Sequence, residues 1–390
     1  MAYILSNANR FYTALESAYG QAGAITAASR IPALKLTVAQ QIETAARKDK
    51  TGSRTYPGTP PGGRRRTSFE LRTYLTTWQG SGTPAYGPMF QAALGGAPLN
   101  FTGGTVASYT SAGRLGFAAA HGLTPGQAVA CGSEIRFTAA IVDANNVQLN
   151  APFTVTPAVG STAGAAVTYT PTTNLPSATI YDYWDPATAV QRMLQGAAVD
   201  QMEILVNGDY HEVRFKGLAQ DVVDSATFTP GSGAGALQSF PAEPARAAFD
   251  YSIVPGNLGQ AWLGTSATQF FTITSASVVL KNGLEARSRE FGSCVPKAIA
   301  PGERTVTAAL ELYSTDDDAT QALYQAARQQ SPISVMFQLG QTAGQMLGVY
   351  LKSVVPEVPE FDDSQNRLQW NFRASRAQGT VDDEVMVAFA

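Results

Sequence analysis

The sequence predicts a mainly β fold with many strands, many turns and few helices. Several segments alternate apolar and polar side chains with the period of two that is typical of half-buried strands. The chain also contains 36 glycines and 22 prolines, which suit turns better than long helices. The clearest helical stripe, in residues 318–328, spans only a few turns before Pro332 stops it.

Bulk composition excludes several classes of protein. The 390 residues can form two or three domains or one elaborated domain, and the 44% of apolar residues suffice for sizeable cores. A net charge of −3 gives no global basic field for nucleic acid or an anionic membrane. Two cysteines make no disulfide framework, and we find neither a secretion signal nor 18 consecutive apolar residues. We therefore expect a soluble protein made in a cytoplasm-like compartment.

The first strands are expected after a short N-terminal arm. Residues 1–30 are rich in small side chains and predict an arm with a short helix near residues 12–18. Residues 33–43 and 68–75 carry alternating apolar side chains, which predicts two strands. Pro88 can then begin a short helix that Gly95 ends.

A long basic loop, residues 47–68, separates these two strands. Its density of Pro and Gly excludes a helix or a central strand. It is either a solvated loop or, as we favour, an arm that orders against an acidic surface on another copy. Nucleic-acid binding is a weaker option because Tyr56 is the only aromatic residue in the loop. The basic residues expected to make the contact are Lys48, Lys50, Arg54, Arg64, Arg65 and Arg66.

Residues 100–174 differ in composition from the rest of the chain. They are rich in Ala, Gly, Thr and Val, and their only basic residues besides His121 are Arg114 and Arg136. Short strands are predicted at residues 134–142, 146–149 and 166–169, with turn signals between them. This pattern indicates a small β-domain inserted on the outside of the main body.

The strongest local signal is a β-hairpin at residues 199–216. Alternating apolar residues flank Asn207-Gly208, which predicts a tight type I′ turn. Residues 228–264 are rich in Gly and Pro and are predicted to be a linker or exposed loop. A strand at residues 268–280 and a second loop lead to residue 301.

The segment from residue 301 to residue 352 predicts a strand, a helix and two further strands. Residues 305–312 alternate as a strand does, and Thr315 and Asp318 can form a capping box at the start of the helix. Alternation at residues 367–375 and 385–389 predicts two final strands.

A weak internal repeat links the two halves of the chain. The spacing of Gly63, Arg65, Leu71 and Tyr74 recurs in Gly302, Arg304, Leu310 and Tyr313. Chance similarity is the alternative, but the order of the expected elements agrees around both strands. We expect a first module in residues 31–99 and 175–265, split by the insertion at 100–174, and a second module in residues 266–390.

The sequence contains no catalytic or cofactor motif. Phosphate-loop, zinc-protease and nucleophile-elbow patterns are all missing. His121, His211, Cys131 and Cys294 have no visible partners, so structural roles are favoured. The acidic clusters at residues 316–318, 362–363 and 382–384 lack the spacing of a calcium loop. We expect no enzyme activity, no cofactor and no metal.

The chain resembles the tail tube proteins of phages with long, non-contractile tails. The resemblance rests on LESAYG at residues 15–20, the basic loop, TSFELRTYL at residues 67–75, and the blocks at residues 273–292 and 306–339. It covers most of the chain outside residues 100–175. It implies a mainly β fold of the tail-tube type, a β-sandwich or barrel with flanking helices, here carrying the inserted domain and, if the internal repeat is real, duplicated.

The resemblance also implies a function. Subunits of that family join side by side so that their strands close a barrel around a lumen, and a loop matching Lys48 to Arg66 reaches the next ring. The implied partners are copies of the chain, the tape measure, tail terminator and distal tail proteins, and phage DNA that passes without tight binding. The implied location is the virion tail, assembled in the host bacterial cytoplasm. A true repeat would favour a trimeric ring with pseudo-sixfold symmetry over a hexamer.

Two alternatives remain open. A tail-tip or tail-surface protein could bind the host through the inserted domain, if aromatic residues there are exposed. Most of them fit strand cores: Phe101, Tyr109, Phe117, Phe137, Phe153 and Tyr169. A wall hydrolase is disfavoured because no acid/base pair stands out. Alternation alone does not show which strand face would line a lumen.

Overall fold

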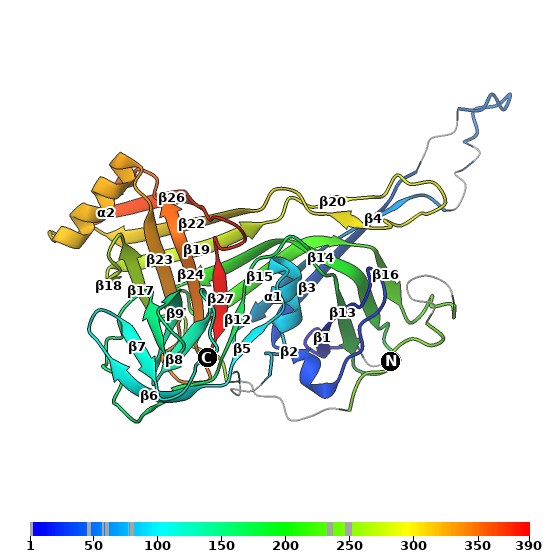
Figure 1. Cartoon of the computed structure of the whole chain (residues 1–390). Coiled ribbons are helices and arrows are strands. Elements are labelled where there is room, and N and C mark those ends of the chain that lie inside the picture. The colour runs from blue at the N-terminus through cyan, green and yellow to red at the C-terminus, as the bar shows by residue number, and fades with distance from the viewer. Residues whose placement is uncertain are drawn as a thin grey trace.

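A computed structural model describes residues 3–44, 48–56, 58, 62–76, 78, 82–231, 237–245 and 252–390. The fold is mainly β, as predicted, and 19 of its strands form one connected antiparallel arrangement that folds into layers. Figure 1 shows a small barrel at the lower left and two long connections at the upper right. In the described part of the chain, no helix has the length and apolar character needed to cross a membrane.

One layer is an eight-stranded antiparallel sheet, which we call the open sheet. Its strands in spatial order are β3 (Ala33–Ile42), β4 (Arg65–Tyr74), β15 (Glu212–Ala219), β14 (Arg192–Val206), β19 (Ile273–Lys281), β22 (Thr305–Tyr313), β26 (Gln369–Ala377) and β25 (Glu360–Asp362). The strands expected at residues 33–43, 68–75 and 305–312 are therefore confirmed.

Two smaller sheets, the flanking sheets, cover one side of the open sheet. The first contains β2 (Arg30–Ile31), β1 (Asn9–Leu15), β13 (Ala178–Trp184), the start of β14 and β16 (Asp221–Asp224). The second contains β18 (Thr268–Phe270), β17 (Gly259–Gly264), β23 (Ile333–Leu339), β24 (Leu347–Val355), β27 (Met386–Phe389), β12 (Ala166–Tyr169) and β5 (Leu99–Phe101). A 3-10 turn, η1 (Ala27–Ser29), and a two-stranded ribbon, β20 (Glu285–Ala286) with β21 (Ile299–Ala300), complete the main body.

The inserted segment forms a closed six-stranded barrel. Its strands in order are β10 (Asn146–Leu149), β7 (Arg114–Phe117), β6 (Gly104–Tyr109), β11 (Thr162–Gly164), β8 (Ala128–Cys131) and β9 (Glu134–Ile141). The barrel packs against the second flanking sheet through Ile135 and Phe137, which meet Met336 and Tyr350. The strand expected at residues 166–169 exists as β12 but belongs to that flanking sheet, because its partners β27 and β5 lie outside the barrel.

Two α-helices lie beside the sheets. α1 (Gly87–Leu94) starts and ends as predicted, with Pro88 in its first turn and Gly95 at its C-cap with φ of 95°. α2 (Asp318–Gln329) is also confirmed, but its cap is Asp317, whose carboxylate accepts the Thr320 N–H at 2.7 Å. The expected capping box of Thr315 and Asp318 is wrong, because Asp317 stands in the right place for the first free N–H groups.

The structure corrects two other local expectations. Residues 12–18 are not helical, because Asn9–Leu15 forms β1 and pairs along its whole length with β13. The Asn207-Gly208 turn is not a two-residue turn, because β15 starts only at Glu212. The chain instead bulges out to meet residues 255–256, where the Gly256 N–H donates to the Asp209 carbonyl at 3.1 Å. In both places a partner distant in sequence overrides the local signal.

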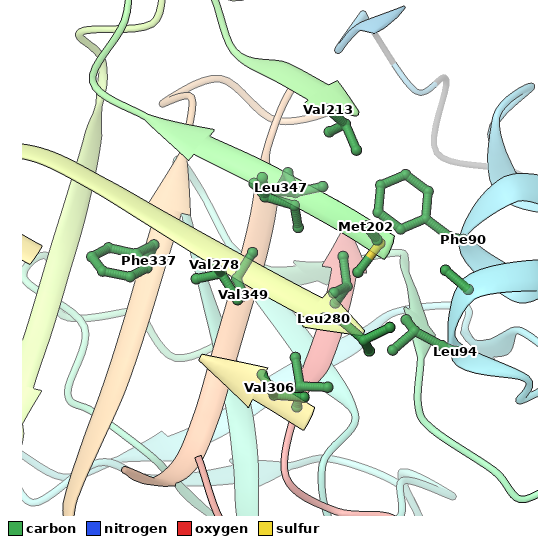
Figure 2. Close-up of a cluster of buried hydrophobic side chains, with 14 of the residues drawn as sticks. Phe90, Leu94, Met202, Val213, Val278, Leu280, Val306, Phe337, Leu347 and Val349 are labelled. Carbon is green, nitrogen blue, oxygen red and sulfur yellow. The ribbon is translucent and has the colours of Figure 1, made fainter. Parts of the chain in front are cut away.

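A single large core lies between the open sheet and the flanking sheets. Figure 2 shows its centre, where Phe90 and Leu94 of α1 point toward Met202 and Leu280 of the open sheet. Val278, Val306, Phe337 and Val349 continue the same cluster across the other half. All of these side chains are buried, so the two halves of the chain share one core.

The same succession of pairings occurs twice along the chain. The series β3, β4, α1, β13, β14, β15, β16 corresponds to β19, β22, α2, β23, β24, β26, β27, with β1 matching β17. The β3–β4 register shifts between Ala33 and Lys35, and the β19–β22 register shifts at the matching place between Ile273 and Ser275. β17 lies in residues expected to be linker and pairs with β23 of the second series.

The arginines of the sequence repeat have equivalent partners. Arg65 at the start of β4 pairs with Asp221 of β16 at 2.9 Å. Arg304 before β22 pairs with Glu384 just before β27, the matching position. One difference separates the halves: β14 is a continuous 15-residue strand, whereas Pro356 and Pro359 separate its counterparts β24 and β25.

A buried carboxylate holds the N-terminal LESAYG segment in place. Glu16 accepts hydrogen bonds from the Ser177 and Thr179 hydroxyls at 2.6 and 2.8 Å. It also accepts the Gly20 and Gly196 N–H groups, both at 2.8 Å. Gly196 has φ of 60° and leaves no room for a Cβ beside Gln220, so the carboxylate fixes the point where β14 bends between sheets.

We predict that Glu16→Gln destabilises the chain by about 1–3 kcal/mol, because an amide nitrogen then faces buried donors that the carboxylate satisfies in the native protein. Thermal unfolding of the purified protein measures this as a lower Tm. Ser17→Ala, an exposed neighbour, is the control and should leave the Tm unchanged. Equal Tm values for Glu16→Gln and wild type would show that the carboxylate does not anchor the segment.

Candidate functional site

One face of the open sheet is polar and faces away from the core. In β4, Thr67, Phe69 and Leu71 are buried, while Glu70 and Arg72 point to the other side. The pairing register carries this alternation across the sheet. The ionic residues on this polar face are Lys35, Arg66, Glu70, Arg72, Glu203, Glu212, Arg214, Lys216, Lys281, Glu311, Glu360, Asp362, Arg373 and Arg376. The face therefore carries basic and acidic side chains in similar numbers.

Ion pairs between neighbouring strands and within one strand combine these charges. Glu212 accepts hydrogen bonds from both Arg72 at 2.8 Å and Arg214 at 2.9 Å. Lys216 lies 3.8 Å from Glu70 on the next strand. At the edge of the sheet formed by β25 and β26, Arg373 and Glu360 pair at 2.6 Å. Because these cations already face carboxylates, the surface presents no strong positive potential to a polyanion.

The Glu212 carboxylate is the centre of the largest of these clusters. Partial burial works to raise the pKa of Glu212, but the hydrogen bonds from Arg72 and Arg214 outweigh it and hold this pKa below its ordinary value. The cluster is therefore fully ionised at neutral pH. Sequence patterning predicted the polar face but not the pairing of Arg72 with Glu212, because these two residues lie far apart in the chain.

The open sheet has two unpaired edges. Within the described residues, β3 pairs only with β4, and β25 pairs only with β26. Both edges carry exposed apolar side chains, with Ile42 on β3 and Phe361 on β25 more than half exposed. An uncovered edge presents free N–H and C=O groups that can pair with another strand.

The six basic residues expected to contact another ring do not form one group. Lys48, Lys50 and Arg54 are exposed in the connection between β3 and β4. Arg64 reaches the Arg289 carbonyl at 3.4 Å, and Arg65 is paired with Asp221. Arg66 lies in β4, which begins at Arg65, so the loop ends earlier than expected. Arg47, the first residue of the predicted loop, lies outside the described residues.

The two ends of the open sheet differ in charge. Both long connections, residues 43–64 and 282–304, leave from one end, beside β4 and β20 in Figure 1. The short connections 207–211 and 363–368 lie at the opposite end. Exposed acidic residues gather at this second end, namely Asp209, Asp316, Asp317, Asp318 and Asp363. A basic connection and an acidic surface thus lie at opposite ends of the same sheet.

The residues considered for catalysis have structural surroundings. His211 is buried, and burial lowers its pKa, so it is neutral while its Nε2 meets the Leu258 carbonyl at 3.2 Å. Burial raises the pKa of the Cys131 thiol to about 12, which leaves no thiolate at neutral pH. His121 contacts the Asp143 carbonyl at 3.1 Å, and Cys294 is exposed. Among the described residues, no three potential ligands are grouped for a metal ion.

The Glu212 cluster predicts a pH-dependent stability. Because the folded pKa lies below the unfolded one, the cluster stabilises the fold above the ordinary carboxyl pKa of about 4.3 and loses this effect at lower pH. We expect Glu212→Gln to lower the free energy of unfolding at about pH 6 by at most about 1 kcal/mol, because the pairs face solvent, and to match wild type near pH 3.

Calorimetry across this pH range measures the difference between the two proteins. Exposed Glu285→Gln is the control and should track wild type throughout. A difference for Glu212→Gln that stays constant with pH would contradict an ionised cluster.

Comparison with known proteins places the chain in a family. No curated protein matches it. Among solved structures, it is similar to the tail tube of SPP1, determined by solid-state NMR and cryo-electron microscopy, with 14% identity and a TM-score of 0.26, over 32% of this chain and 78% of that one. A family model described as phage tail tube protein matches residues 6–390. The chain therefore belongs to the phage tail tube protein family.

Proposed function

We propose that copies of this chain join edge to edge into rings, that the rings stack into the tail tube, and that phage DNA passes along the polar face. The observation that carries this proposal is the open sheet, with one polar face and two unpaired edges. Closing the sheet into a barrel would satisfy both edges at once. The barrel of residues 104–164 packs on the side of the second flanking sheet that faces away from the open sheet, so it would lie on the outside of the tube.

Three chains would then make one ring with pseudo-sixfold symmetry. The repeated succession of pairings supports two tube-forming modules per chain, as proposed for residues 31–99 with 175–265 and for residues 266–390. The pairing of β1 with β13 and of β17 with β23 supports adding β1 to the first module and β17 to the second. Tape measure, tail terminator and distal tail proteins remain the proposed partners, with assembly in the host bacterial cytoplasm.

The charges on the polar face suit the lining of a channel that DNA passes through without binding tightly. Tight phosphate binding needs accessible cations that displace counterions from the DNA. On this face Arg72, Arg214 and Arg373 already face carboxylates. We therefore propose weak, salt-sensitive contact with DNA rather than a binding site.

Host binding by the inserted barrel has less support. Five aromatic side chains that could have formed a binding surface are buried instead: Phe101, Phe117, Phe137, Phe153 and Tyr169. Tyr109 is half-buried, and its hydroxyl accepts the Phe153 N–H at 2.7 Å. A barrel with its aromatic residues turned inward is better suited to a structural decoration.

Electron microscopy of the purified protein tests the proposal directly. We expect hollow tubes or stacked rings at high protein concentration, with three copies per ring. Persistent monomers under all tested conditions would overturn the tube, and six copies per ring would overturn the three-chain arrangement alone.

The basic connection predicts electrostatic stacking between rings. We expect replacement of Lys48, Lys50 and Arg54 by Ser to shorten tubes and reduce their salt sensitivity, because these exposed cations would meet the acidic end of the next ring. Tube length at several salt concentrations measures the effect.

A variant with Ser at Arg114, Arg328 and Lys352 is the charge-matched control, since it removes the same charge from the barrel, α2 and β24. Equal shortening by both variants would attribute the effect to net charge rather than to the connection.

A further inference from the structure

The chain itself contains one example of the strand pairing that would form between neighbouring copies, and we call such a pairing a joint. Where its two halves meet, β14 pairs with β19 in antiparallel register. Opposed residues there are Glu203 with Val279, Ile204 with Val278, and Leu205 with Ser277. Ile204 and Val278 are buried in the shared core, whereas the other two pairs lie on the polar face.

The two free edges of the open sheet are the equivalents of these two strands. β3 corresponds to β19, because each precedes a long connection and has the same register shift against the strand that follows. β25 corresponds to the second half of β14, because β26 pairs with it as β15 pairs with β14. Two equivalences fix the alignment. Phe372 lies opposite Leu310 as Phe215 lies opposite Leu71. Glu360 lies opposite Asn371 as Glu203 lies opposite Arg214.

We propose that β25 of one copy pairs with β3 of the next copy in the register of the internal β14–β19 joint. Transferring that register opposes Glu360 to Ala39, Phe361 to Val38, and Asp362 to Thr37. This inference rests on the proposed function and adds the strands, the alignment and the contacts by which copies join.

Side chains at the two edges complement one another in this register. Phe361 is 56% exposed in the single chain, whereas its internal equivalent Ile204 is 0% exposed. Pairing lays Phe361 against Val38, which packs on the main core, so the core continues from one copy into the next. On the polar face, Lys35 comes to lie diagonally across from Asp362, within reach of an ion pair.

Disulfide trapping tests the register. In a Cys131→Ala, Cys294→Ser background, Ala39→Cys with Glu360→Cys puts thiols at opposed positions, about 4.5–5.5 Å apart between Cα atoms. That spacing suits a disulfide, and both residues are exposed, so the changes leave the core intact. We expect covalent dimers and trimers in non-reducing electrophoresis, ending at the trimer because the third disulfide closes the ring.

Two further cysteine pairs are matched controls. Thr37→Cys with Glu360→Cys is out of register by two residues, about 7 Å along the strand, and should give several-fold less product. Glu203→Cys with Val279→Cys is the equivalent pair inside the chain and should form a disulfide within each monomer.

Electron microscopy of the same samples separates this inference from the proposed function. Tubes that crosslink through Thr37 rather than Ala39 would show another register, and tubes that crosslink through neither would show another joint. Either result overturns the inference and leaves the tube standing. A background protein that forms no rings or tubes overturns both, and a ladder reaching six copies keeps the register but overturns the three-chain ring.

Discussion

The backbone pairing between β14 and β19 is the interaction on which the rest of the structure depends. The first part of β14 belongs to a flanking sheet, and its second part joins β15 to β19 in the open sheet. An internal strand satisfies its N–H and C=O groups on both sides, so this one ladder unites the two halves under one core. The result is one open sheet that runs through both halves of the chain and, in its described residues, leaves β3 and β25 with one neighbour each.

The layers follow from that arrangement and suit a structural protein, consistent with a family that is not enzymatic. Going outward from the polar face come the open sheet, the core, the flanking sheets and the barrel. Arg136 of the barrel contacts β17 of the second flanking sheet. Its guanidinium is buried, lies 4.8 Å from the centre of the Trp262 ring and donates to Gln260 at 3.0 Å. Burial lowers the pKa of Arg136 to about 10, so it remains charged at neutral pH beside Glu134.

Sequence reasoning succeeded where local pattern determines structure. Alternation located β4 and β22, Pro88 and Gly95 located α1, and a faint repeat pointed to arginines that share an equivalent ion pair. It failed where distant partners decide. The helix expected at residues 12–18 does not form, because residues 9–15 pair with β13 as a strand. The unpaired edges could not be predicted, because no local pattern shows that a strand lacks a neighbour. The basic residues of the loop were predicted to contact another copy, but Arg65 forms an ion pair with Asp221 of its own chain.

Pro356 and Pro359 interrupt the chain between β24 and β25, whereas the equivalent strand β14 is continuous. Proline offers no N–H, and a short interrupted strand is a poor template for other chains. A single pairing between copies at this edge would therefore be weak, and two chains that met would separate again easily. In the proposed ring, the last chain to enter would form two such pairings for one loss of translational freedom, so closure would be favoured over open chains of copies. In the proposed assembly, the two prolines would therefore act on its timing: growth among free chains would be slow, and the closed ring would be the first species to persist.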